Sequence, residues 1–295
     1  MWVAQPATEE AFILGEGPVW DAERRRVLWV DITAGLVLIG RLADSRIEIV
    51  DRLSFPSMVG AVAPARDGRL LVATQEQLVV VAVDGGRTDG IRLLAPGSGR
   101  RLNDGKTDPQ GRFVVGTLLF DAPGSEQLVR LEGSDAVTVI DDGLTLSNGM
   151  AWSPDGSRFY SIDTYDRRIW QREYFGGSRP PGPRTPFVDF TDGLPDGMCT
   201  DTEGHAWVAA YRGGQVRRFA PDGTLSGLVS VPTPHVTSVA FAGPGLDTLV
   251  ITTARQKLTA EQLVEFPHSG CLFTVDVGVS GVPVAYWEPE YGTIA

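Results

Sequence analysis

Cysteine, histidine and long hydrophobic runs are scarce in this 295-residue chain, and each scarcity excludes a class of protein. Two cysteines, Cys199 and Cys271, are too few for a disulfide framework or a cysteine metal cluster. The longest apolar run, Leu78 to Val83, has six residues, whereas about 20 are needed to cross a bilayer. The N-terminal residues lack the basic segment and apolar stretch of a secretory signal. We therefore expect a cytoplasmic protein with no membrane partner.

Positive charge is in deficit, because 26 Lys and Arg face 37 Asp and Glu, for a formal net charge of −11. The densest basic cluster, Arg24 to Arg26, has Asp21 and Glu23 beside it. Nucleic-acid phosphates bind to a basic face, so this charge balance excludes a nucleic-acid partner. Nothing in the composition requires an oligomer, and a monomer is compatible with it.

Helical periodicity is absent as well. No segment of 12 or more residues repeats its apolar positions at the helical period, and only Leu258 to Phe266 suits a helix of one or two turns. The chain instead has 35 Gly and 20 Pro between short apolar stretches such as Arg69 to Thr74 and Arg112 to Thr117. Short strands separated by Gly, Pro and Asp turns predict an all-β fold.

The turn signals recur at a nearly constant spacing. Four tight turns end in glycine and are each followed by a β-rich run: Ala65–Gly68, Asp108–Gly111, Ser153–Gly156 and Asp201–Gly204. We call the position eight residues before each of these glycines an anchor, which gives Gly60, Asn103, Asn148 and Asp196. Two weaker copies of the pattern add the anchors Glu16 and Thr237 or Ser238. Successive anchors are separated by 44, 43, 45, 48 and about 42 residues.

A repeat of this length with four strands per unit is typical of a β-propeller blade. Six copies predict a six-bladed β-propeller, formed by residues 1–295 as one domain. We favour a closed ring over an open solenoid because no polar capping repeat is visible. The strand that closes the ring comes either from residues 1–10 or from Val282–Tyr286, and the pattern leaves both open.

The innermost strand of each propeller blade lines the central channel, so the anchors are expected to meet at one mouth. Glu16, Asn103, Asn148 and Asp196 offer oxygen ligands there, and the two asparagines are the only ones in the chain. Asn-Gly and Asp-Gly pairs are also common turn dipeptides, which is the structural alternative. Glu16 favours a functional site over a purely structural turn, because a turn in the Gly-Glu-Gly-Pro segment does not require a long acidic side chain.

Glu16, Asn148 and Asp196 form an all-oxygen set with two negative charges, which suits Ca²⁺, Mg²⁺ or Mn²⁺. Zn²⁺ or Fe²⁺ is a less natural occupant without His or Cys ligands. Three protein ligands leave coordination positions open, so a bound cation could polarise a substrate or activate water. The sequence thus predicts one divalent cation in the central channel.

Arg101 lies two residues before Asn103 and is expected on the same side of its strand. Its guanidinium either binds substrate oxygens or forms a salt bridge with the ring carboxylates, and both roles remain open. The histidines follow no metal-ligand spacing, so we expect structural or surface roles for His205, His235 and His268.

Six short motifs resemble, in order and spacing, those of the regucalcin/gluconolactonase family of sugar lactonases, over nearly the whole chain. They are Leu14-Gly-Glu-Gly-Pro-Val-Trp20, Arg101-Leu-Asn-Asp-Gly-Lys106, Asp108-Pro-Gln-Gly-Arg112, Leu146-Ser-Asn-Gly-Met150, Leu194-Pro-Asp-Gly-Met198 and Thr252-Thr-Ala-Arg255. The resemblance implies a six-bladed propeller with one divalent metal, held by Glu16, Asn148 and Asp196. It also implies that Asp196 is the general base and that Arg101 and Asn103 contact the sugar lactone.

One segment departs from the family pattern, which often has a Glu shortly after a Gly-Thr-Met sequence. This chain reads Gly116-Thr-Leu-Leu-Phe-Asp121, so Asp121 is expected to contact the substrate with a shorter reach. Leu118 and Phe120 make this part of the rim more apolar. The departure bears on which lactone binds rather than on the class of reaction.

The resemblance implies hydrolysis of an aldonolactone, such as gluconolactone, xylonolactone or arabinonolactone, to the aldonic acid. The alternatives are a metal-dependent phosphotriesterase similar to diisopropylfluorophosphatase, a non-catalytic calcium-binding or scaffold propeller, and a carbohydrate-binding propeller. A phosphotriester favours an apolar pocket, whereas sugar hydroxyls need donors and acceptors such as Arg101 and Asp121.

Overall fold

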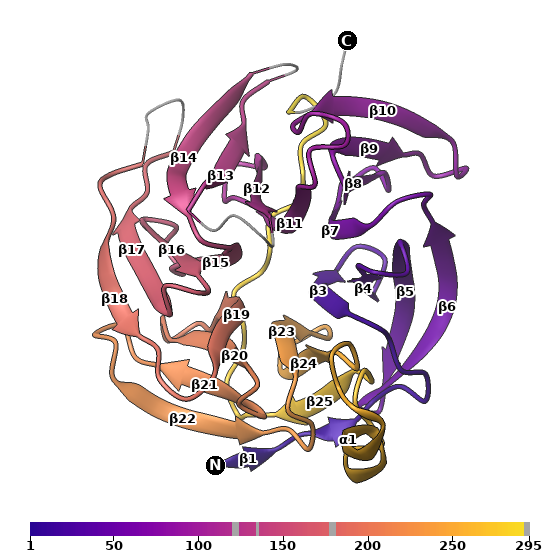
Figure 1. Cartoon of the computed structure of the whole chain (residues 1–295), viewed down its shortest axis with the longest axis vertical. Coiled ribbons are helices and arrows are strands. Elements are labelled where there is room, and N and C mark those ends of the chain that lie inside the picture. The colour runs from indigo at the N-terminus through magenta and orange to yellow at the C-terminus, as the bar shows by residue number, and fades with distance from the viewer. Residues whose placement is uncertain (120–123, 134–135, 177–180, 292–295) are drawn as a thin grey trace.

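The computed structural model describes residues 1–119, 124–133, 136–176 and 181–291. Their strands form six sheets arranged in a ring, and each sheet is a blade with one strand beside a central channel (Figure 1). This confirms the six-bladed β-propeller predicted from the repeat. The helix expected within residues 258–266 is α1 (Ala260–Glu265), which Thr259 caps. Within the described residues, no helix has the length and apolar character needed to cross a membrane.

The first three blades follow the chain from the inner to the outer strand. Blade 1 contains β3 (Gly15–Asp21), β4 (Arg26–Asp31), β5 (Leu36–Ala43) and β6 (Arg46–Ser54). Blade 2 contains β7 (Val59–Pro64), β8 (Leu70–Thr74), β9 (Gln77–Val81) and β10 (Arg87–Arg92). Blade 3 contains β11 (Arg101–Thr107), β12 (Phe113–Leu118), β13 (Glu126–Leu131) and β14 (Val137–Leu144).

The remaining blades follow the same order, apart from the outer strand of the last. Blade 4 contains β15 (Ser147–Trp152), β16 (Arg158–Asp163), β17 (Arg168–Glu173) and β18 (Thr185–Asp189). Blade 5 contains β19 (Leu194–Thr200), β20 (Ala206–Tyr211), β21 (Gln215–Phe219) and β22 (Leu225–Ser230). Blade 6 contains β23 (Val236–Ala242), β24 (Thr248–Thr253), β25 (Phe273–Asp276) and β2 (Gln5–Pro6).

The N-terminus closes the ring. β2 pairs antiparallel with β25, with Gln5 opposite Thr274 and Pro6 opposite Phe273. β1 (Trp2–Val3) extends this tie to blade 5, where it pairs in parallel with β22. Residues 1–10 therefore supply the closing strand, one of the two options that the sequence left open.

The C-terminal segment covers the end of the channel away from the anchors. The backbone N–H of Val282 donates to the carbonyl of Thr200, and that of Trp287 donates to the carbonyl of Pro64. Thr200 and Pro64 are the last residues of the inner strands β19 and β7. In Figure 1 this segment is the yellow trace that passes behind the centre of the ring. A ligand consequently reaches the channel from the anchor end.

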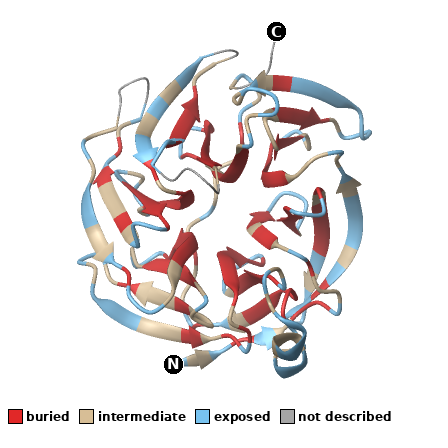
Figure 2. Ribbon diagram, viewed as in Figure 1, coloured by how far each residue is buried: buried red, intermediate tan, exposed pale blue. Residues whose placement is uncertain are grey.

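The hydrophobic core lies between the blades. Among the described residues, each of the six junctions between neighbouring blades holds one cluster of buried apolar side chains. Trp29 packs at the junction of blades 6 and 1, and Trp207 at that of blades 5 and 6. Figure 2 shows that the inner strands are buried while the outer strands are largely exposed. Sheet-on-sheet packing thus holds the ring together and leaves the channel to polar side chains.

Every inner strand has a β-bulge near its start. The register with the second strand shifts between Glu16 and Val19, Val59 and Ala61, Leu102 and Gly105, Asn148 and Met150, Pro195 and Met198, and Val236 and Ser238. A bulge leaves a residue out of the ladder and changes the direction of its side chain. The bulges therefore coincide with the anchor positions, where the sheet must turn side chains toward the channel mouth.

Gly149 allows the inner strands of blades 4 and 5 to approach closely. A Cβ atom at this position would lie 2.3 Å from the backbone oxygen of Asp196 and 2.9 Å from the backbone nitrogen of Met198. These are backbone atoms of a buried strand, so they cannot rotate away as a flexible side chain could.

We expect Gly149→Ala to lower the free energy of unfolding by about 1–3 kcal/mol, because the added methyl group must push two packed strands apart. Gly182→Ala is the control, since its Cβ would have its nearest contact with Glu173 at 3.5 Å. That change should stay within about 0.5 kcal/mol. Denaturant unfolding measures both variants, and equal midpoints would contradict the close approach at Gly149.

Candidate active site

Each anchor is the second or third residue of its inner strand, and the anchors gather at one mouth of the channel. Five residues predicted for the site line one cavity of about 90 Å³ there, and each is at most 7% exposed: Glu16, Arg101, Asn103, Asn148 and Asp196. Glu16 comes from blade 1, Arg101 and Asn103 from blade 3, Asn148 from blade 4 and Asp196 from blade 5. The ring thus brings together residues that lie far apart in the sequence.

Hydrogen bonds fix the two asparagine side chains. Asn103 Nδ2 donates to the Ser147 carbonyl at 2.8 Å and to Asn148 Oδ1 at 3.3 Å. Asn148 Nδ2 donates to Thr164 Oγ1 at 3.1 Å, and Thr164 in turn donates to the Pro195 carbonyl at 2.9 Å. This chain of bonds connects blades 3, 4 and 5 and orients the Asn148 amide, so that Oδ1 acts as the acceptor.

Glu16 and Asp196 are two carboxyl groups buried side by side. Burial raises the pKa of Glu16 well above its ordinary value, and the charges of Asp196 and Asp104 raise it further. Burial also raises the pKa of Asp196 well above its ordinary value, with Asp104 adding to the effect. Arg101 acts to lower the pKa of each acid, but burial and the neighbouring carboxylates outweigh it. The cavity therefore favours either protonated acids or an additional positive charge.

Arg101 reaches the cavity from the start of β11. Its Nη1 donates to Asn103 Oδ1 at 2.6 Å and to the Leu102 carbonyl at 3.1 Å. Burial lowers the pKa of Arg101 to about 10, while Glu16 and Asp196 act to raise it. The guanidinium stays charged at neutral pH, so it can bind substrate oxygens and also offset the acids.

The donor set fits a hard divalent cation. Two carboxylates and an oriented amide oxygen are the ligands that Ca²⁺, Mg²⁺ or Mn²⁺ prefer. In the part of the chain that the structure describes, Asp196 Oδ1 is buried without a hydrogen-bond partner. A cation at Glu16, Asn148 and Asp196 would use that oxygen and replace the protons that burial otherwise favours.

Two other anchors supply no ligand to this set. Gly60 has no side chain, and a Cβ there would lie 2.6 Å from the backbone oxygens of Leu102 and Asn103. Thr237 is fully buried and donates to the Gly15 carbonyl at 2.6 Å, which ties blade 6 to blade 1. Asp121, expected to contact the substrate, lies outside the residues that the structure describes.

A second ring of side chains also lines the cavity, and of its members the sequence indicated only Leu118. Ile32, Leu118, Thr164 and Tyr211 line the cavity, each 15 or 16 residues after an anchor. That offset corresponds to one hairpin, because the second strand of each blade returns to the mouth where the first began. The repeat itself could therefore have located these four residues. Connections between strands add Tyr165, Gln256 and Lys257.

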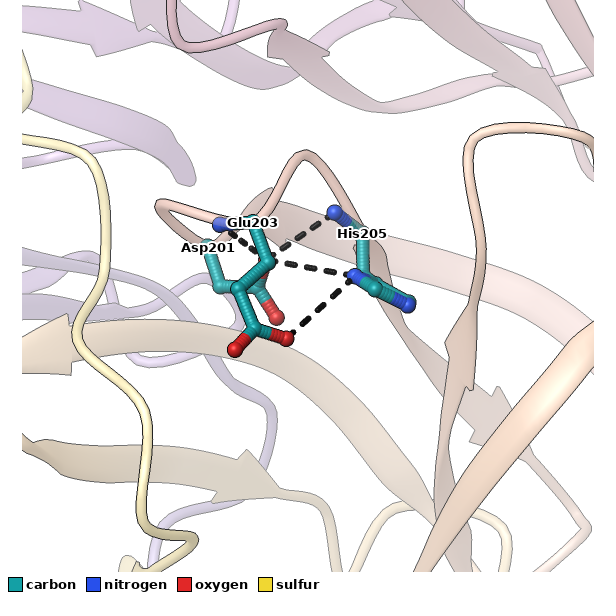
Figure 3. A group of neighbouring side chains, drawn as sticks. All are labelled: Asp201, Glu203 and His205. Atoms are coloured by element: carbon teal, nitrogen blue, oxygen red, sulfur yellow. Dashed lines mark hydrogen bonds and ion pairs between the residues drawn. The ribbon is translucent and has the colours of Figure 1, made fainter.

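A separate acidic cluster lies at the other end of blade 5, where Asp201, Glu203 and His205 have ligand atoms within 4.8 Å of one another (Figure 3). Asp201 Oδ1 accepts from the backbone N–H groups of Glu203 at 3.0 Å and His205 at 2.9 Å. Asp201 Oδ2 accepts from Trp207 Nε1 at 2.9 Å. Asp108 accepts two equivalent backbone bonds in the hairpin of blade 3. The cluster is therefore a repeated turn structure whose central carboxylate is already occupied.

The chain is similar to known proteins over nearly its whole length. The family model described as SMP-30/gluconolactonase/LRE-like region matches residues 14–255. A pentonolactonase of Haloferax volcanii is 36% identical over 282 residues, which cover 92% of this chain and 93% of the relative. A 6-deoxy-6-sulfogluconolactonase of Pseudomonas putida is 36% identical over 277 residues, which cover 91% and 93%. The crystal structure of a calcium-binding regucalcin from Agrobacterium tumefaciens matches with a TM-score of 0.88 and 26% identity, over 97% of this chain and 98% of the other.

The raised pKa of Asp196 predicts how pH affects the stability of the metal-free protein. A carboxyl group whose pKa is higher in the folded state binds its proton more tightly there, so stability is lost as pH rises through that range. Asp196→Asn has no carboxyl group to titrate at this position, so its folded state does not lose this stability as pH rises. In the presence of a chelator, we expect the variant to be more stable than the wild type at pH 7–8, and the difference to shrink toward pH 4.

Thermal or urea unfolding across this pH range measures the difference. Asp192→Asn is the control, because Asp192 is exposed and asparagine tolerates its left-handed backbone, with φ of 51°. A difference between Asp196→Asn and wild type that stays constant with pH would contradict the electrostatic account.

Proposed function

The chain belongs to the SMP-30/gluconolactonase/LRE-like family, and from this membership and the geometry of the cavity we propose that it hydrolyses an aldonolactone with the help of one divalent cation. The family match confirms the resemblance seen in the six motifs. Two relatives named as lactonases, each 36% identical over most of the chain, identify the chain as a hydrolase of sugar lactones. The aldonic acid is the product of that reaction, and gluconolactone, xylonolactone and arabinonolactone are the candidate substrates.

One observation carries the metal-dependent part of the proposal: two buried carboxyl groups and an oriented amide share one cavity with an arginine. Glu16, Asn148 and Asp196 would hold the cation, whose chemistry there is polarisation of the lactone carbonyl. Ca²⁺, Mg²⁺ and Mn²⁺ suit the oxygen ligands better than Zn²⁺ or Fe²⁺ does.

Asp196 is the group that we assign as the general base. Its Oδ1 is buried without a partner among the described residues and would bind the cation, which leaves Oδ2 to take up a proton. Glu16 Oε2, by contrast, accepts from the Gly17 N–H at 3.0 Å. As the oxygen of water bonds to the carbonyl carbon, its proton passes to Asp196. The ring C–O bond then breaks, and Asp196 returns the proton to the departing oxygen, which becomes a hydroxyl group.

Arg101 and Asn103 position the substrate in this scheme. Arg101 carries several donors in a planar fork, and Asn103 holds that fork through its Oδ1. Both side chains are buried and hydrogen-bonded, so little conformational freedom is lost when a lactone binds. Asp121 would contact the sugar hydroxyls.

Asp196→Asn tests the assignment of the base. We expect the variant to lose at least about 100-fold in kcat on gluconolactone or xylonolactone, because a neutral amide neither takes up a proton nor binds a cation well. A pH-indicator assay measures the reaction after subtraction of spontaneous ring opening. His205→Ala is the control, since His205 belongs to the turn cluster at the other end of blade 5.

Normal lactonase activity in Asp196→Asn, or an equal loss in His205→Ala, would contradict the assignment. The same wild-type preparation separates the alternative functions. Faster turnover of a fluorophosphate than of any aldonolactone would favour the phosphotriesterase, and lactone binding without ring opening would favour a carbohydrate-binding propeller. Calcium binding without either activity would favour the non-catalytic propeller.

Chelation followed by return of single metals tests the cation. We expect the chelated enzyme to lose its lactonase activity and one added divalent cation to restore it, because the acids otherwise favour their protonated forms. Restoration should require Glu16, so Glu16→Gln should respond weakly to every metal. Full activity in the chelated wild-type enzyme would refute the metal requirement.

A further inference from the structure

Lysine is nearly absent from this chain, which has two lysines and 24 arginines. Both lysines lie along the central channel. Lys106 Nζ donates to the Met198 carbonyl at 2.7 Å, and Lys257 lines the cavity at the anchor end. The ammonium group of lysine is compact, whereas the guanidinium of arginine is larger and planar. Apart from the histidines, the other basic residues of the chain are all arginines, so lysine, with its compact ammonium group, occurs only at these two positions.

Lys257 is an exposed residue that lines the cavity, and it belongs to the blade opposite that of Arg101. It follows β24 of blade 6, and Arg101 begins β11 of blade 3, so the two blades face each other across a ring of six (Figure 1). Glu16, Asn148 and Asp196 come from blades 1, 4 and 5, between these two. A ligand held beside the acids therefore has a positively charged donor on either side.

The loop that carries Lys257 is held in place. The Gln256 N–H donates to the Ile13 carbonyl at 2.9 Å, and the Gln256 carbonyl accepts from His235 Nδ1 at 3.0 Å. The His235 ring stacks on Tyr211 with 4.3 Å between the ring centroids. Lys257 itself has φ of 64°, a left-handed conformation that side chains with a Cβ rarely adopt. Such a conformation persists where its surroundings impose it, so Lys257 is presented to the cavity from a fixed backbone.

We propose that Lys257 binds the substrate and sets its specificity, by donating hydrogen bonds to lactone hydroxyls remote from the reacting carbonyl. The inference rests on the proposed function and adds a second contact region to it, on blade 6. Arg101 and Asn103 bind one side of the lactone, and Lys257 binds the other. The ligand class is a polyhydroxylated lactone, as opposed to an unsubstituted one.

The Lys257→Met variant tests the proposal, because methionine keeps much of the side-chain length and removes the ammonium group. On gluconolactone we expect kcat/KM to fall roughly 10- to 100-fold, mainly through a higher KM, as for the loss of a charged hydrogen bond. On δ-valerolactone, whose ring has no hydroxyl groups, the change should stay within about twofold. Lys257→Arg should fall between wild type and Lys257→Met on gluconolactone.

Arg255→Met is the matched control. Arg255 is exposed, lies on the same loop and is not among the described residues that line the cavity. Its activity on both lactones should match the wild type. An equal loss on the two lactones in Lys257→Met would indicate a structural role for the loop and overturn the inference. No loss on gluconolactone would overturn it as well.

Ligand binding gives a readout that does not depend on turnover. 1,5-Anhydroglucitol has the ring hydroxyls of gluconolactone but no carbonyl to be attacked, and calorimetry measures its binding. We expect Lys257→Met to weaken this binding and Arg255→Met to leave it unchanged. Equal binding by wild type and Lys257→Met would overturn the inference, even if lactone hydrolysis is established. Lys257-dependent binding without hydrolysis would sustain the inference and refute the proposed function.

Discussion

Two carboxyl groups, those of Glu16 and Asp196, are buried against each other at the hub of a ring of sheets. Burial disfavours the charged form of each acid, the charge of Asp104 adds to this effect on both, and a single arginine does not outweigh these effects. Arg101 is itself held by Asn103, and its own pKa is lowered by burial. The arrangement therefore calls for one more positive charge. A cation held by Glu16, Asn148 and Asp196 would supply that charge, and in the proposed reaction it would polarise the lactone carbonyl.

The repeated structure of the blades brings these buried acids together. Each blade places its anchor at the same position of an inner strand, beside a bulge, and packing between blades fixes the strands around the channel. A side chain at an anchor position is thus buried whether or not it is polar. Two anchors have structural roles: Gly60 allows the inner strands of blades 2 and 3 to approach closely, and Thr237 donates a hydrogen bond to the Gly15 carbonyl. The acids and amides of the candidate site occupy the other anchors: Glu16, Asn103, Asn148 and Asp196.

The ring, its six blades and the meeting of four polar anchors in one cavity could be predicted because one repeat determines them all. Arg101 lines the same cavity, as alternation along its strand predicted. The closing strand could not be predicted, since β2 contributes only Gln5 and Pro6 to its ladder and carries no repeat signal. Of the second ring of lining residues only Leu118 was predicted, although the repeat encodes the others one hairpin after their anchors, as at Thr164 and Tyr211. Lys257 could not be predicted for another reason, because it lies in the connection between β24 and β25, residues 254–272, which is longer than the corresponding connection of any other blade.

The central claim is that the acids at the hub share one cation, and crystals soaked with Mn²⁺ test it most directly. The account predicts one strong anomalous difference peak bounded by carboxylate oxygens of Glu16 and Asp196 and by Asn148 Oδ1. The soaked Asp196→Asn crystal should lose that peak. A peak at Asp201, Glu203 and His205 instead, or an empty hub with both acids turned away from a common centre, would contradict the account.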